Sequence, residues 1–79
     1  MSNLELYKKA FMESLDVTED QLEGLKYTDV PGWDSVGHMG LIAMLEDTFS
    51  IMMDTDDIID LSSFEKGKEI LKKYNVIID

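Results

Sequence analysis

The stretch Gly32-Trp33-Asp34-Ser35-Val36-Gly37-His38-Met39 decides the fold, because it joins a long polar segment to a strongly apolar one. Asp34 is of a residue type that favours helix N-caps, and apolar residues recur at helical spacing after it. We therefore predict a helix from Ser35 to about Phe49. Its apolar positions cover more than a single stripe, so part of them should face a partner or a cavity. These positions are Val36, Leu41, Ile42, Leu45 and Phe49.

A first helix is predicted before this stretch. Ser2 and Glu5 have the spacing of a capping box, and apolar residues then recur at helical spacing as far as Leu15. From Asp16 to Trp33 the periodicity weakens and Gly and Pro interrupt the chain, which predicts a long loop with one helical turn around Thr18 to Leu25. Loops of this length usually carry function or wrap the core.

Two further helices are predicted after it. Thr55 is expected to cap a short third helix, whose first turn holds Asp56 and Asp57. Ser62 and Glu65 have the spacing of a second capping box, which would open a last helix that runs to Tyr74. No hairpin signal or internal repeat appears. The expected fold is all-α, one domain over residues 1–79, a four-helix bundle of three longer helices and a short third one.

Composition excludes several classes of function. The chain has 79 residues, no Cys, and seventeen Asp and Glu against seven basic residues, all of them Lys, for a net charge of -10. Nucleic acid and anionic membranes are therefore poor partners, whereas basic protein surfaces are good ones. No segment resembles a signal peptide or a membrane span, so we expect a cytoplasmic monomer without membrane insertion. So short a chain has little room for a catalytic cleft, and we do not expect an enzyme.

The sequence resembles the acyl carrier protein family over nearly its whole length. These small, acidic four-helix proteins hold intermediates as thioesters on a 4′-phosphopantetheine arm. Asp34-Ser35-Val36 falls on the family's Asp-Ser-Leu signature, at the start of the second helix. Leu45-Glu46-Asp47-Thr48-Phe49-Ser50-Ile51 is similar to its Leu-Glu-x-x-Phe-Gly-Ile segment. Size, charge and the order of helices agree as well.

The resemblance implies a function and a set of site residues. A phosphopantetheinyl transferase would attach the arm to Ser35 beside Asp34, and acyl-activating and acyl-transferring enzymes with basic docking surfaces would be the partners of the loaded carrier. The cargo would be an acyl or aminoacyl group, which the family can hold in a cavity between the second and third helices. A serine at the first helical position suits this role, because the free N–H groups and the helix dipole favour a phosphodiester. The residues expected to contact partners are Val36, Met39, Glu46, Asp47, Asp56 and Asp57.

Three features depart from the family's usual pattern. Gly37 and Gly40 stand where acidic residues are common, and their spacing would open one face of the helix to a partner or to the arm. Trp33 replaces a smaller residue and would be either a lid over the core or a recognition residue. His38 would be an exposed imidazole or a contact to the arm, rather than a catalytic partner of Ser35.

Two other functions fit parts of the sequence. Asp54, Asp56, Ser62 and Glu65 fall at ligand positions of an EF-hand calcium loop, but Ile58 and Ile59 stand where the loop needs an oxygen ligand and a glycine. An acidic helical module that docks to partners and is never modified would share the same surface. Modification of Ser35 distinguishes that module from a carrier.

Overall fold

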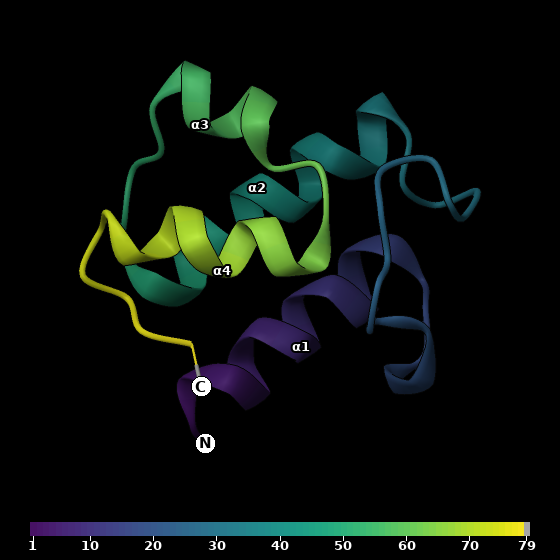
Figure 1. Cartoon of the computed structure of the whole chain (residues 1–79), viewed down its shortest axis with the longest axis horizontal. Coiled ribbons are helices and arrows are strands. Elements are labelled where there is room, and N and C mark those ends of the chain that lie inside the picture. The colour runs from purple at the N-terminus through teal and green to yellow at the C-terminus, as the bar shows by residue number, and fades with distance from the viewer. Residues whose placement is uncertain (79) are drawn as a thin grey trace.

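A computed structural model describes residues 1–78, and it confirms the all-α fold (Figure 1). In this part of the chain there is no strand. The longer helices α1 and α2 pack together, and α4 crosses in front of α2 with α3 above it. The elements are α1 (Asn3–Leu15), the 3-10 turn η1 (Glu19–Gln21), α2 (Ser35–Phe49), α3 (Thr55–Asp60) and α4 (Phe64–Lys72).

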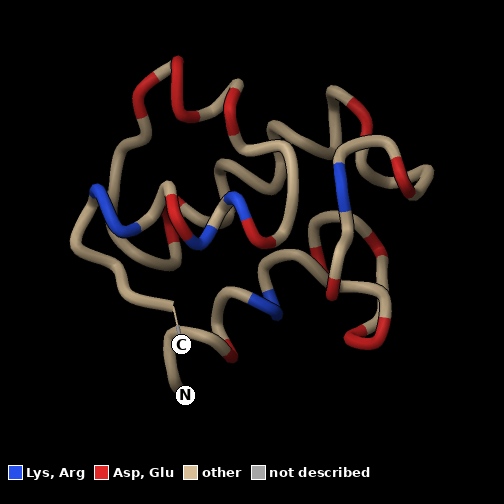
Figure 2. The backbone as a smooth tube through the Cα atoms, in the orientation of Figure 1, with Lys and Arg blue, Asp and Glu red and all other residues tan. Residues whose placement is uncertain are grey.

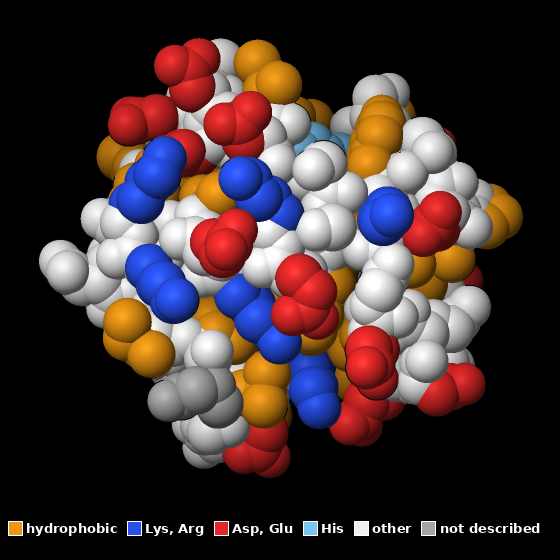
Figure 3. All heavy atoms as spheres, viewed as in Figure 1, with side chains coloured by type: hydrophobic (Ala, Val, Ile, Leu, Met, Phe, Trp, Pro, Cys, Tyr) orange, Lys and Arg blue, Asp and Glu red, His pale blue; other side chains and the backbone are white. Residues whose placement is uncertain are grey.

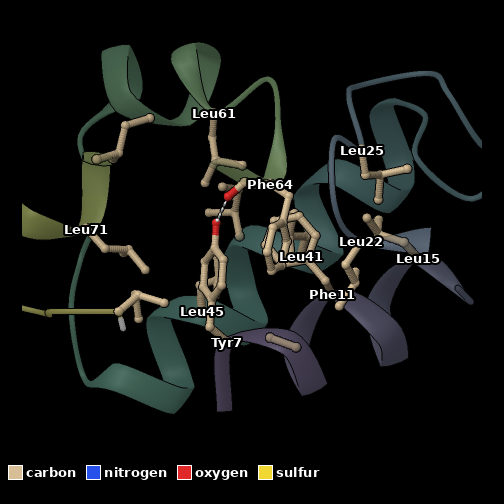
Figure 4. Packing of buried hydrophobic residues seen from close by; sticks show 14 of the residues in the cluster. Tyr7, Phe11, Leu15, Leu22, Leu25, Leu41, Leu45, Leu61, Phe64 and Leu71 are labelled. Atoms are coloured by element: carbon tan, nitrogen blue, oxygen red, sulfur yellow. Dashed lines mark hydrogen bonds between the residues drawn. The ribbon is translucent and has the colours of Figure 1, made fainter. Parts of the chain in front are cut away.

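The core is one continuous cluster to which all four α-helices or their flanking segments contribute (Figure 4). At its centre, Tyr7, Phe11 and Phe64 lie with their ring centroids 4.9–5.0 Å apart. The buried hydroxyl of Tyr7 donates a hydrogen bond to the carbonyl oxygen of Phe64 at 2.7 Å. Gly67 makes room for it, because a Cβ there would overlap the Tyr7 hydroxyl. This bond fixes α1 against the start of α4.

The long loop between α1 and α2 wraps the core, which is one of the two roles that its length suggested. Val17, Leu22 and Leu25 bury their side chains, and η1 supplies the predicted helical turn. Lys26 and Ser63 form an isolated antiparallel bridge, in which the amide of Tyr27 donates to the carbonyl of Ser62 at 2.8 Å. The loop that precedes α2 is thus tied to the segment that connects α3 to α4, although α2 and α3 lie between them in the sequence.

Two predicted caps are wrong by one residue. Asp54, not Thr55, precedes the first turn of α3. Ser63, not Ser62, caps α4, and its Oγ accepts from the amide of Lys66 at 2.9 Å, so the predicted capping box does not form. Ser62 is not available for the cap because its carbonyl belongs to the bridge with the loop.

The last helix also ends earlier than predicted. Lys72 is its final residue, and Asn75 then takes the left-handed backbone conformation with a φ of 63°. Near this end the side-chain amide of Asn3 donates to the carbonyl of Ile77 at 3.1 Å, so the start of α1 lies beside the last described residues.

Charge is unevenly distributed over the surface. Acidic residues gather on α3 and on the loop after α1, whereas the lysines, apart from one in that loop, lie on α4 and α1 (Figures 2 and 3). Four of the seven lysines lie in α4 or directly after it: Lys66, Lys68, Lys72 and Lys73. The excess of negative charge therefore falls on the remainder of the molecule, including the α3 end.

Candidate functional site

Ser35 is the first residue of α2, and its side chain is exposed. The cap is made by Asp34, whose Oδ1 accepts from the amide of Gly37 at 2.8 Å. The carbonyl of Asp34 accepts from the amide of His38 at the same distance. Since Asp34 caps the helix, the hydroxyl of Ser35 stands at the helix N-terminus without serving as the capping group.

An apolar pocket of about 330 Å³ opens directly beside Ser35. It lies between the start of α2, the C-terminal half of α3 and the long loop, and its walls are mostly hydrocarbon. The lining residues are Tyr27, Ser35, His38, Met39, Ile58, Ile59, Leu61 and Ser62. Ser35 is thus itself part of the pocket's lining.

His38 forms one wall of the pocket and is held from both sides. The indole Nε1–H of Trp33 donates to its Nδ1 at 3.0 Å, and its Nε2 lies 2.7 Å from the carbonyl oxygen of Ile58. Because an indole N–H only donates and a carbonyl only accepts, Nδ1 of His38 accepts from Trp33 and Nε2 donates to Ile58. The expectation of an exposed imidazole is therefore wrong. Both ring nitrogens are engaged, so His38 is not paired with Ser35 as a catalytic base would be.

Trp33 belongs to the core. Its side chain is fully buried and meets Phe11 edge to face, with ring centroids 5.5 Å apart. The imidazole of His38 lies beside it at the hydrogen-bonded edge, with the two rings nearly parallel at an interplanar angle of 16° and their centroids 6.2 Å apart. Of the two roles that the sequence left open for Trp33, the structure gives it the structural one, beneath the site.

The predicted partner contacts separate into two groups. Val36 and Met39 are exposed, at 79% and 55%, and Asp47 and Asp56 are exposed too, so these four can meet a partner. Glu46 is half-buried, and its Oε2 accepts from the amide of Met53 at 2.9 Å. Because the Glu46 carboxylate binds the backbone of the segment after α2, it is less available for hydrogen bonds to a partner.

Asp57 departs from the expectation of a free surface charge, because it is buried. Its Oδ1 lies 2.8 Å from the ammonium of Lys73, and its Oδ2 accepts from the hydroxyl of Tyr74 at 2.6 Å. These hydrogen bonds, that of Lys73 first, lower the pKa of the Asp57 carboxyl. They raise the pKa of Lys73 in turn. Asp57 thus anchors α3 to the end of α4.

The sequence pattern predicts no site role for Ile58 and Ile59, which enter there only as residues that do not fit a calcium loop. Both line the pocket, and Ile59 is 71% exposed. Gly37 differs from its expected role as an opening for a partner or for the arm. A Cβ at residue 37 would overlap the carbonyl of Gly32, so the protein's own loop fills this space. The space around Gly40 is open.

Other candidate sites carry less. The calcium-loop interpretation fails on geometry. Of its four residues only Asp56 lies in α3, whereas Asp54 precedes that helix, Ser62 follows it and Glu65 belongs to α4. No group of three His, Asp or Glu side chains within residues 1–78 could hold a metal ion. A larger pocket of about 670 Å³ lies between α1, η1 and α4, but its two lysines, Lys8 and Lys68, are paired with Glu19 and Glu65. None of the described helices has the length and apolar character needed to cross a membrane.

The chain was compared with known proteins by sequence and by structure. No protein-family model matches it, and no curated protein or solved structure does. The functional assignment therefore rests on the residues and on the geometry of the site beside Ser35.

Proposed function

We propose that this protein is an acyl carrier, in which Ser35 accepts a 4′-phosphopantetheine arm. The observation that carries the proposal is the position of Ser35, exposed at the first turn of α2 and at the mouth of an apolar pocket. In the attachment step, Ser35 Oγ forms a bond to the β-phosphorus of coenzyme A and loses its proton, and the pyrophosphate bond breaks to release 3′,5′-ADP. When bound, the arm supplies the thiol that the cysteine-free chain lacks and holds the cargo as a thioester.

The residues around Ser35 fit a phosphodiester. The capping bond of Asp34 holds the first turn in place, and the positive end of the helix dipole stabilises an anion at its N-terminus. A second observation supports the resemblance on which the proposal draws. Ser50 stands where the family has Gly after Phe49, and its backbone takes the left-handed conformation that favours glycine, with a φ of 55°.

Partner enzymes would approach the end of the molecule that holds Ser35 and α3. Exposed Val36 and Met39 offer apolar contacts there, and Asp56 and Asp60 on α3 add negative charge. Such a surface favours transferases with basic docking faces, because complementary charge speeds the encounter.

The test is the intact mass of the protein after incubation with coenzyme A and a broad-specificity phosphopantetheinyl transferase. We expect a gain of one phosphopantetheine on the natural chain and none on Ser35→Ala. Ser62→Ala is the matched control, because Ser62 is an exposed serine that lines the same pocket, and it should be modified like the natural chain. No gain on a chain folded by circular dichroism would favour the unmodified docking module.

A further inference from the structure

The imidazole of His38 connects the long loop, α2 and α3 through two hydrogen bonds. The indole Nε1–H of Trp33 donates to Nδ1 at 3.0 Å, and Nε2–H donates to the carbonyl oxygen of Ile58, which lies 2.7 Å away. We call this pair of bonds the His38 link. An imidazole that accepts at one nitrogen and donates at the other carries a single proton. The link therefore requires the uncharged ring.

A second proton on His38 is incompatible with the link. In the charged ring both nitrogens are donors, so Nδ1–H would point at the indole N–H of Trp33, which is also a donor. Trp33 is fully buried and packs edge to face on Phe11, so the core holds it in place. Both nitrogens belong to one rigid ring, and a ring that leaves the indole also leaves the carbonyl of Ile58. Proton uptake therefore breaks both bonds.

The loop and α2 offer no counter-ion that would hold a charged His38 in place. From the loop, the uncharged phenol ring of Tyr27 meets the imidazole edge to face, with ring centroids 5.7 Å apart. On α2 itself, the carboxylate of Asp34 accepts from the amide of Gly37 and does not line the pocket that His38 lines. A charged ring left in this apolar wall would lose water without gaining an opposite charge, which is costly.

The carboxylates of α3 are turned elsewhere as well. Asp57 is buried against the ammonium of Lys73 at the end of α4. Asp56 and Asp60 are exposed, and neither lines the pocket. What α3 presents to the imidazole is the carbonyl of Ile58.

The position of α3 depends strongly on such hydrogen bonds. It has six residues, and a helix this short is not stable by itself. None of its hydrophobic side chains is fully buried, since Ile58 is half-buried and Ile59 is 71% exposed. Asp57 attaches it to α4, and the His38 link attaches it to α2. Elements with so little apolar burial open at a low free energy.

We propose that His38 makes the fold acid-sensitive: the uncharged ring holds α3 against the start of α2, and the protonated ring releases the C-terminal half of α3. The net charge of -10 favours proton uptake. Release would move Ile59 and Asp60 relative to Ser35. The inference goes beyond the proposed function, because it concerns the fold whether or not Ser35 is modified. Failure of Ser35 to take up phosphopantetheine would overturn the function and leave the link intact.

NMR of the natural chain between pH 8 and pH 5 tests the link without any variant. The chain has one His and one Trp, so each ring signal belongs to a known residue. Over this range histidine is the side chain that ordinarily changes its charge. We expect protonation of the imidazole, a shift of the indole N–H signal and loss of protection in α3 to share one midpoint.

Protection is measured by hydrogen exchange at the amides of Ile58 and Leu61, which donate to carbonyls of the preceding turn. Each rate is divided into the rate of an unstructured chain at the same pH, which removes the intrinsic effect of pH. Protection should fall roughly 10-fold, the effect of one or two hydrogen bonds, while that of Leu45 within α2 stays constant. The proposal is wrong if the imidazole takes up its proton with the indole and α3 unchanged, or takes up none above pH 5.

Two variants separate His38 from other titrating groups. His38→Gln keeps the link, because its amide can accept from Trp33 and donate to Ile58, but this amide does not titrate. Protection in α3 should then be the same at pH 8 and pH 5, and a remaining 10-fold loss would assign the effect to carboxylates and overturn the proposal. Tyr27→Phe is the matched control, because it keeps the ring that contacts His38. It should lose protection as the natural chain does; loss of the pH dependence in this variant would contradict the role of the Trp33 bond.

Discussion

The carbonyl oxygen of Gly32 occupies the space into which a Cβ at residue 37 would project. The loop that precedes the site therefore packs directly on the backbone of the first turn of α2, two residues after Ser35. Gly40 lies one turn further along the same helix, and nothing approaches the position of its missing Cβ. The two glycines have the same residue type and secondary structure but different surroundings.

We expect opposite effects from alanine at these two positions. Gly37→Ala should destabilise the protein by about 1–3 kcal/mol, because the loop must move away from the helix. Gly40→Ala should stabilise it by about 0.8–1.0 kcal/mol through helix propensity alone. Urea denaturation of the two variants and the natural chain measures both values. Equal effects at both positions would show that the contact with Gly32 carries no energy.

Ser50 ends α2 in a left-handed conformation, at φ 55° and ψ 48°. For a residue with a Cβ this conformation costs roughly 1–2 kcal/mol, and glycine avoids that cost. Glycine also has more conformational freedom in the unfolded chain, which cancels part of the gain in stability. Ser50→Gly should therefore stabilise the protein by about 1 kcal/mol, a rise of roughly 4–8 °C in melting temperature. Ala43→Gly, at an exposed position within the same helix, is the control and should lower the melting temperature. A decrease with both variants would contradict the backbone argument.

Local patterns in the sequence were enough to predict the helices but not every cap. Asp34 and the apolar run after it predicted both bounds of α2, because a cap and a periodicity are properties of neighbouring residues. Ser62 and Ser63 are the same residue type, and the choice between them depends on a backbone bridge to Tyr27, far away in the sequence. No local pattern contains that information.

The candidate site shows the same division. The exposure of Ser35 and its place at the start of α2 follow from the cap at Asp34. The difference between exposed Asp56 and buried Asp57 depends on the contact with Lys73 and Tyr74, sixteen and seventeen residues later. One of the two hydrogen bonds of His38 likewise depends on Ile58, twenty residues away. Such contacts arise only when the chain is folded.

Asp57 should make stability depend on pH. The pKa of its carboxyl lies below its ordinary value of 3.8, because Lys73 and Tyr74 donate hydrogen bonds to the charged form. A lowered pKa in the folded state means that this stabilisation is present above the unfolded value, about 3.9, and is lost as the pH falls through the folded value.

Asp57→Asn removes this contribution at every pH. The melting temperature of the variant should lie below that of the natural chain at neutral pH, and the gap should narrow below about pH 4. Asp56→Asn is the matched control, because Asp56 is exposed in the same turn of α3. The gap for this control should be small at neutral pH. If the gap for Asp57→Asn stayed constant down to about pH 2, the ion pair with Lys73 would not be the source of the stability.

Tyr7 links α1 to α4 through its buried hydroxyl, and burial raises the pKa of that hydroxyl. Tyr7→Phe removes the bond to the Phe64 carbonyl while keeping the aromatic contacts of the core. We expect a loss of about 0.5–1.5 kcal/mol in the free energy of unfolding, which corresponds to a melting temperature lower by roughly 2–12 °C. Calorimetry of both proteins measures it. Tyr27→Phe, at a ring that is 40% exposed, should change stability by less than about 0.5 kcal/mol. Equal losses at both positions would mean that the cost comes from removing any tyrosine hydroxyl, and not from the bond between α1 and α4.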